Sequence, residues 1–365
     1  MDFNNDQKFL AALSHFPKFG ATKLKKLNRY FPSFQEAFQA NLNNLKQAGI
    51  EENIANEFII ARAKLNPEEI DEKLSLEKIK IITIKDDLYP KLLKEILDAP
   101  FLLYYKGELK KDESLALAVV GSRLMTSYGK LVVEKIIPGL KASGLTIVSG
   151  LALGIDALAH ESALENNLRT VAVLGTGLDQ KSLYPAQNNY LADKIIANNG
   201  ALLSEFPLGT KPLKINFPQR NRIVAGLSLG TLVIEANERS GALITAKMAL
   251  DYNREVFAIP GNINSLSSRG PNNLLKEGAR LVTSAQDITE TLNLGQLKIF
   301  ETNKKTLPTT QEESIIFNIL QNEIKHINDL VRLSSLDTSK INATLIVMEM
   351  KGIIQNMGNG HYGIK

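Results

Sequence analysis

Between about residues 76 and 290, short apolar runs alternate with longer amphipathic stretches, and this alternation limits the fold more than any other feature. The apolar runs consist almost entirely of Val, Ile, Leu and Ala, which indicates strands buried on both faces. The sequence therefore predicts an α/β fold, a Rossmann-like doubly wound domain with a mainly parallel sheet. The expected strands are residues 115–120, 145–148, 170–174, 201–204, 231–235, 255–259 and 280–282, with 81–84 as an added edge strand, and the expected helices include 129–142, 155–165, 190–197, 223–227 and 243–251.

Residues 1–68 depart from this pattern and are expected to form a small helical domain of the SAM or helix-hairpin-helix kind. Pro17 and Gly20 interrupt apolar residues at helical spacing. The backbone amides of such a turn can face a DNA phosphate, with lysines nearby. A packing domain with solvated lysines fits equally well, because short helical hairpins are common. The lysines concerned are Lys18, Lys23, Lys25 and Lys26.

The C-terminal part predicts a polar linker at 291–310 and a winged-helix domain at 311–365, with three helices (313–321, 327–333 and 338–351) before a Gly-Asn-Gly hairpin. A winged helix can read duplex DNA, as in a transcription factor. However, residues 312–365 carry five Lys or Arg and six Asp or Glu, a net charge of −1. Duplex affinity depends heavily on phosphate neutralisation, so we expect this domain to contact protein instead.

Composition excludes several classes of function. The 365 residues include no Cys, which rules out disulfides, thiol nucleophiles and iron–sulfur clusters. The four His have no metal-ligand spacing, so we expect neither a metal nor a cofactor. A polar N-terminus and the lack of a long apolar run predict a cytoplasmic protein without a membrane segment.

The candidate site follows from the fold, because open parallel sheets bind ligands at the carboxyl ends of their strands. Small residues follow several of the predicted strands. Ahead of helix starts they expose backbone N–H groups that favour anions, although βα turns also use Gly and Ser for structural reasons. The residues in these turns are Gly121, Ser122, Arg123, Ser149, Gly150, Ser240 and Gly241.

A basic loop at residues 211–222 adds cations and an aromatic ring to this edge. Arg220 and Arg222 could grip phosphate oxygens, and Lys214 adds a further positive charge. Phe217 could stack an unpaired base, which points to single-stranded nucleic acid rather than duplex. The alternative is that Phe217 anchors a surface loop in the core.

These residues carry a resemblance to the DNA-processing protein A family (DprA, also called Smf). The similar stretches run in order through the central domain, and together they are specific. They are Val120-Gly-Ser-Arg123, Ser149-Gly-Leu-Ala-Leu-Gly-Ile-Asp-Ala-Leu-Ala-His160, Val171–Asp179 with Tyr184-Pro185 and Asn188, Ser204-Glu-Phe-Pro207, Phe217-Pro-Gln-Arg-Asn-Arg-Ile223 through Ala225-Gly-Leu-Ser228, Glu235-Ala236, Ser240–Ala246, Phe257-Ala-Ile-Pro-Gly261 and Gly270–Ala279.

The resemblance implies a protein without enzymatic activity that binds incoming single-stranded DNA during natural transformation. It also implies protection of those strands and help in loading the RecA recombinase onto them. The family's DNA pocket carries over to Arg123, Lys214 and Phe217. A homodimer through the Rossmann domain is a further implication.

Two enzymatic functions are alternatives to this reading. Gly175 and Gly177 follow a strand, but a third glycine and an acidic residue at the end of the next strand are missing, so NAD binding is not expected. Nucleoside-monophosphate N-glycosidic hydrolysis on a related Rossmann fold would need an acid/base set. Asp156, Glu205 and Glu235 could supply one, but we expect these residues to cap helices or orient arginines.

Overall fold

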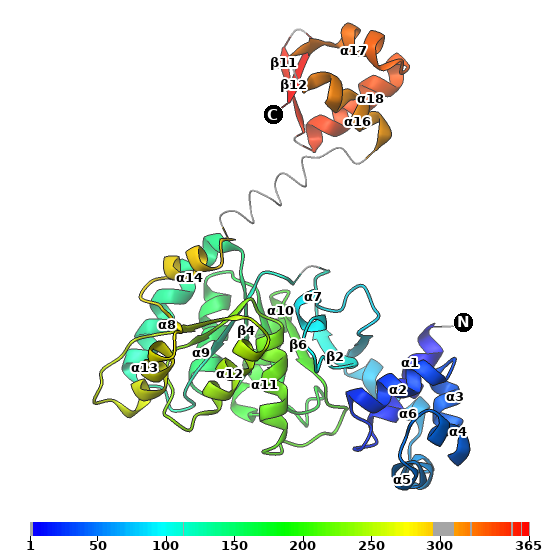
Figure 1. The fold of residues 1–365 in the computed structure, drawn as a ribbon, viewed down its shortest axis with the longest axis vertical. Helices are drawn as coiled ribbons and strands as arrows, with labels where there is room; N and C mark the ends of the chain where they lie inside the picture. Colours follow the sequence, from blue (N-terminus) through cyan, green and yellow to red (C-terminus); the bar gives the residue numbers. More distant parts are fainter. Residues whose placement is uncertain are drawn as a thin grey trace. The chain divides into compact units, whose positions relative to one another are not determined.

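The computed structural model describes residues 3–111, 113–294, 310–321, 323–351, 353–358 and 360–364. The chain divides into two compact units, Met1–Leu292 and Asn293–Lys365 (Figure 1). The predicted linker at 291–310 lies mostly outside the described residues. Within the described part, no helix is long and apolar enough to cross a membrane.

A nine-stranded sheet forms the centre of the first unit, within the described residues. Its order is β1-β2-β6-β5-β4-β3-β7-β8-β9, and every pairing from β6 to β9 is parallel. This confirms the predicted Rossmann-like fold, and β3 and β7 stand where the strand order reverses. The strands are β1 (Lys80–Thr83), β2 (Leu102–Gly107), β3 (Ala116–Val120), β4 (Thr146–Ser149), β5 (Thr170–Leu174), β6 (Ala201–Ser204), β7 (Gly230–Val233), β8 (Glu255–Ala258) and β9 (Arg280–Leu281).

Strand β2 is not among the strands that the sequence predicts. It runs antiparallel to both β1 and β6, so the predicted edge strand at 81–84 pairs with β2 at the end of the sheet. No α/β crossover links β2 to its neighbours, and the alternation of strands and helices therefore gives no signal for it. The four residues Leu102–Tyr105 are nevertheless buried, like those of the parallel strands.

Helices cover both faces of the sheet. Along β5, Ala172 and Leu174 pack in a cluster with helix α10, whereas Val171 and Val173 pack in a second cluster with α11 and α12. Alternate side chains of one strand thus enter opposite layers. The helices of this domain are α7 (Lys91–Lys94), α8 (Ser127–Gly139), α9 (Ile155–Glu165), α10 (Asn189–Ala197), α11 (Asn216–Gly226), α12 (Gly241–Asp251), α13 (Arg269–Lys276) and α14 (Ala285–Thr291).

The N-terminal helices share a core with the sheet near β2 (Figure 1). Phe16 and Phe58 belong to the same buried cluster as Phe101 and Tyr104. The hydroxyl groups of Ser14 and Tyr104 lie 2.6 Å apart, within hydrogen-bond distance. The boundary expected between residues 68 and 76 therefore stays a prediction. The helices are α1 (Phe3–Ser14), α2 (Ala21–Tyr30), α3 (Phe34–Gln39), α4 (Leu42–Gln47), α5 (Glu52–Arg62) and α6 (Pro67–Leu76).

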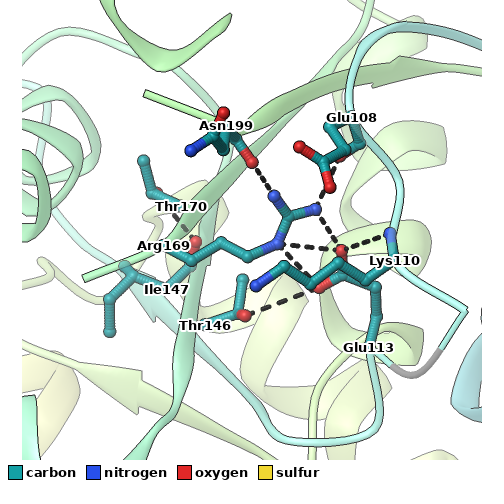
Figure 2. A network of polar contacts seen from close by, with 8 residues as sticks. All are labelled: Glu108, Lys110, Glu113, Thr146, Ile147, Arg169, Thr170 and Asn199. Carbon is teal, nitrogen blue, oxygen red and sulfur yellow. Dashed lines mark hydrogen bonds and ion pairs between the residues drawn. The ribbon is translucent and has the colours of Figure 1, made fainter. Parts of the chain in front are cut away.

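A buried ion pair ties the amino ends of the central strands together (Figure 2). Arg169, just before β5, donates from Nε to the carboxylate of Glu113 at 2.9 and 3.2 Å. Its guanidinium also donates to the carbonyl oxygens of Glu108 and Asn199. Glu113 in turn accepts from Thr146 at the start of β4. This network lies at the edge of the sheet opposite the carboxyl ends of the parallel strands.

The second unit has the predicted winged-helix fold. Three helices pack around a core that contains Ile316, Leu330 and Ile341, and β11 pairs antiparallel with β12. Asn359, in the predicted Gly-Asn-Gly turn, lies outside the described residues. The elements are α16 (Gln311–Leu320), β10 (Lys325–His326), α17 (Ile327–Ser334), α18 (Thr338–Met350), β11 (Ile354–Gly358) and β12 (His361–Ile364).

Candidate functional site

A cleft of about 750 Å³ opens at the carboxyl ends of β3 and β7. This is the point where the strand order reverses, and therefore the expected ligand position in an open α/β sheet. Eight of the eleven predicted site residues line it: Gly121, Ser122, Arg123, Lys214, Phe217, Arg220, Ser240 and Gly241. Residues far apart in the sequence are thus brought to one rim of the sheet.

Gly150 lines a small pocket of about 30 Å³ that shares several residues with the cleft. Its lack of a side chain is required, because a Cβ there would lie 2.4 Å from the guanidinium nitrogens of Arg220. Arg220 Nη1 donates to the Gly150 carbonyl oxygen at 2.5 Å and also to that of Val173. Gly150 therefore brings its backbone against the buried arginine that forms the cleft floor.

The guanidinium of Arg220 is a structural element rather than a free cation. Burial lowers its pKa to about 10, and the positive charge of Arg123 acts in the same direction, while Asp156 opposes them. Burial likewise raises the pKa of Asp156, whose carboxylate accepts from the Gly150 amide at 3.1 Å. Arg220 Nη1 is used by two backbone carbonyls and Nε donates to the Asn221 side chain at 3.2 Å, so the buried guanidinium is fixed in place and shapes the floor of the cleft.

The other two predicted site residues, Ser149 and Arg222, line neither the cleft nor the small pocket. Ser149 is fully buried and donates to the Val119 carbonyl oxygen at 2.6 Å, which links two strands. Arg222 forms ion pairs with Glu205 and Asp98 and lines a separate groove of about 730 Å³. Residues two apart on a helix point about 200° apart, so Arg220 and Arg222 cannot both face one cleft. Counting cations along the basic loop could not reveal this difference.

Besides the buried Arg220, the cations that line the cleft are Arg123, Lys214 and Arg239, and none of these three forms an ion pair in the described part of the chain. Arg239 is not among the predicted site residues. It lies in the turn after β7, next to Ser240, whose hydroxyl accepts from the Ala242 amide and caps α12. The sequence could have pointed to Arg239, because it directly precedes Ser240, which is a predicted site residue.

Two aromatic rings stand at one end of the cleft. Phe217, in the first turn of α11, lies under the Arg123 guanidinium, whose Cζ is 5.3 Å from the ring centroid. The ring of Tyr184 lies 5.9 Å from that of Phe217, at 47°. Tyr184 is not a predicted site residue, although it belongs to one of the stretches that carry the family resemblance.

The three carboxylates that the hydrolase alternative would need do not lie together, and each one has its own hydrogen-bond or ion-pair partners. Glu235 accepts from the Thr126 amide at 2.9 Å and from Ser267 at 3.3 Å, which holds the start of α8. Glu205 pairs with Arg222, and burial raises its pKa. Asp156 lines the cleft but is held by the Gly150 amide. The contacts of Glu235 and Glu205 agree with the expected capping and orienting roles, whereas Asp156 holds a loop amide instead.

Comparison with known families gives two matches. The model for DNA recombination-mediator protein A covers residues 80–293, and that for the DprA winged-helix domain covers residues 301–360. A curated protein named Smf from Synechocystis sp. is 41% identical over 310 residues, which is 84% of this chain and 77% of the relative. The DNA processing protein DprA of Streptococcus pneumoniae is 51% identical over 212 residues, 58% of this chain and 74% of the relative.

Solved structures agree with these relatives. The X-ray structure of DNA processing protein A from Streptococcus pneumoniae is 39% identical, with a TM-score of 0.65, over 80% of this chain and 98% of the other. That of the Helicobacter pylori protein, described by its single-stranded DNA binding mode, is 33% identical, with a TM-score of 0.51, over 58% and 95%. The chain therefore belongs to the DNA recombination-mediator protein A family.

Proposed function

We propose that this chain binds single-stranded DNA in the cleft at the end of β3 and β7 and catalyses no reaction there. The observation that carries the proposal is the convergence of Arg123, Lys214 and Phe217 on one cleft. Cations on a strand backbone and a ring for an unstacked base are the two parts of a single-strand site. The binding mode described for the Helicobacter pylori relative supports the same choice of ligand.

The remaining cleft residues fit phosphate recognition. Arg239 adds a third cation, and the turns at Gly121–Ser122 and Ser240–Gly241 bring backbone amides to the rim. We assign Arg220 and Gly150 to the cleft floor. We assign Arg222 and Ser149 no direct contact with DNA. The Arg222 side chain forms ion pairs with acidic residues, and the Ser149 hydroxyl donates to a backbone carbonyl inside the sheet.

The absence of catalysis is supported by how the carboxylates are held. A hydrolase needs an acid and a base near one reacting bond. Glu205 and Glu235 are bound to partners away from the cleft lining, and Asp156 is tied to the Gly150 amide. Release of free base from nucleoside monophosphates, assayed with the purified protein, would contradict this assignment.

We also propose for this chain the wider cellular role that its resemblance to the family implies. The chain would work in the cytoplasm as a homodimer, protect incoming single strands during natural transformation and help load RecA onto them. Sedimentation of the purified chain tests the homodimer, and RecA filament formation on strands coated with single-strand-binding protein tests the loading.

The direct test compares single-stranded and double-stranded oligonucleotides by fluorescence anisotropy. We expect the single strand to bind at least about tenfold more tightly at the same salt concentration, because base stacking requires unpaired bases. Equal or stronger binding of the duplex would overturn the proposal.

A further inference from the structure

The aromatic end of the cleft offers more exposed ring surface on Tyr184 than on Phe217. Tyr184 is 44% exposed, whereas Phe217 is half-buried. Both rings line the cleft and also the small adjoining pocket. Their centroid distance of 5.9 Å is that of two rings in contact, so the rings form one continuous aromatic surface and leave no slot between them.

The surroundings of Phe217 explain why so little of its ring is open. On one side it packs against the backbone at Gly175, where a Cβ would lie 3.1 Å from its Cδ1 atom. The Arg123 guanidinium lies over the ring, and Tyr184 packs beside it. A base that approaches from the cleft therefore meets a more open aromatic surface on Tyr184 than on Phe217.

We propose that Tyr184 is a second base-stacking residue of this cleft, and that its ring extends the aromatic surface that begins at Phe217. The inference rests on the proposed binding of single-stranded DNA and adds a residue to that site. The Tyr184 hydroxyl makes no hydrogen bond within the described residues, so the packing of the ring on Phe217, and not the hydroxyl, positions this side chain. Stacking of this kind accepts any base, because every base has a π-face.

A purely structural role for Tyr184 makes a different prediction. If its side chain only packs on Phe217, an apolar residue of similar size should replace it. Tyr184→Phe keeps the ring, whereas Tyr184→Leu keeps an apolar contact but loses the stacking surface. We expect Tyr184→Phe to bind oligothymidylate within about twofold of the unchanged protein, and Tyr184→Leu to bind about tenfold more weakly.

The chain contains no Trp, which allows a direct spectroscopic test. Tyr184→Trp would place its one indole at the proposed stacking position, and oligothymidylate should quench the indole fluorescence as it binds. The matched control is Tyr190→Trp, because Tyr190 is 49% exposed on α10 and does not line the cleft. The fluorescence of this control should not change.

The outcomes separate this inference from the function on which it rests. Anisotropy of labelled oligothymidylate measures binding by every variant, and thermal unfolding checks that each is folded. If the strand binds but leaves the indole at position 184 unquenched, or if Tyr184→Leu binds normally, Tyr184 is not a stacking residue. If the unchanged protein does not bind the strand at all, the proposed function fails, and this inference fails with it.

Discussion

The cations near the cleft differ in their burial and in their ion pairs. These differences decide how much each positive charge can contribute to DNA binding. Arg220 is a buried part of the cleft floor, and Arg222 is neutralised by acidic neighbours. Arg123, Lys214 and Arg239 face the cleft without an ion pair in the described part of the chain. Free cations of this kind displace counterions from a nucleic-acid backbone when they bind it.

Replacement of any one of these three free cations by Ala should weaken single-strand binding and reduce its dependence on salt. For each phosphate that the variant no longer neutralises, the slope of log affinity against log salt should fall by about 0.7. Titrations of Arg123→Ala, Lys214→Ala and Arg239→Ala at several salt concentrations measure this slope. Lys64→Ala is the control, because Lys64 is exposed outside the cleft. Unchanged slopes in all three variants would place the strand elsewhere.

His160 is a buried residue whose protonation should affect stability. The Thr170 hydroxyl donates to the Ile147 carbonyl oxygen at 2.8 Å, so Nδ1 of His160 is the donor in its 2.6 Å contact with Thr170. Nε2 is buried without a partner in the described structure. Burial, assisted by the charge of Arg220, lowers the pKa of His160 to about 3, and the ring is therefore neutral in the folded protein.

The depressed pKa of His160 predicts a loss of stability in acid. An unfolded His binds a proton below about pH 6.5, whereas the folded one stays neutral down to about pH 3. The free energy of unfolding should therefore fall as the pH falls through this window. His160→Gln should flatten that dependence, measured by urea unfolding at a series of pH values. An identical slope in the variant would show that other groups account for it.

Among the elements, the starts of β4 and β5 are joined to the β2–β3 connection by the Arg169–Glu113 pair (Figure 2). These two side chains are only 10% and 5% exposed, whereas the Arg280–Glu255 pair at the edge of the sheet is 61% and 43% exposed. A buried charge without a partner is costly, but an exposed one is solvated by water.

Glu113→Gln should therefore lower the free energy of unfolding by about 3 kcal/mol, because it leaves Arg169 buried without its countercharge. Glu255→Gln removes the same charge from the exposed pair and should cost less than about 1 kcal/mol. Urea unfolding of the two variants side by side gives the comparison. Similar changes in both variants would mean that burial does not set the strength of the Arg169–Glu113 pair.

Prediction from the sequence succeeded for elements that alternate and failed for those that do not. The parallel strands were found because each is an apolar run followed by a helix. Strand β2 has the same buried composition but belongs to an antiparallel extension, which that rule does not describe. The helical periodicity of α11 would have separated Arg220 from Arg222. Tyr184 could not be placed from the sequence, because its turn reaches the cleft only through the folded path of the chain after β5.

On the scale of the whole molecule, the cleft lies entirely within the unit Met1–Leu292. The N-terminal helices belong to that unit, because their aromatic residues share a core with Phe101 and Tyr104. A fragment of residues 76–290 would expose this core, so the smallest fragment suited to a binding test is residues 1–292. In the winged helix, α18 exposes Ile346, Val347 and Met350, the last of them by 83%, which supports the proposed contact with protein.

Removal of residues 310–365 should accordingly leave single-strand affinity within about twofold, since the free cations and both rings of the cleft remain. Anisotropy titrations of the full chain and of residues 1–309 test this expectation. A collapse of affinity in the shortened chain would mean that the winged helix contributes directly to strand binding.

The close approach of Gly150 to Arg220 has a consequence for how this family can vary. Any side chain at position 150 would occupy the space of the guanidinium, and the guanidinium in turn holds the carbonyl group of that same residue. A substitution at either position alone should destabilise the fold, so the residues at positions 150 and 220 should covary. Relatives should carry a residue larger than glycine at position 150 only where the position of Arg220 no longer holds an arginine.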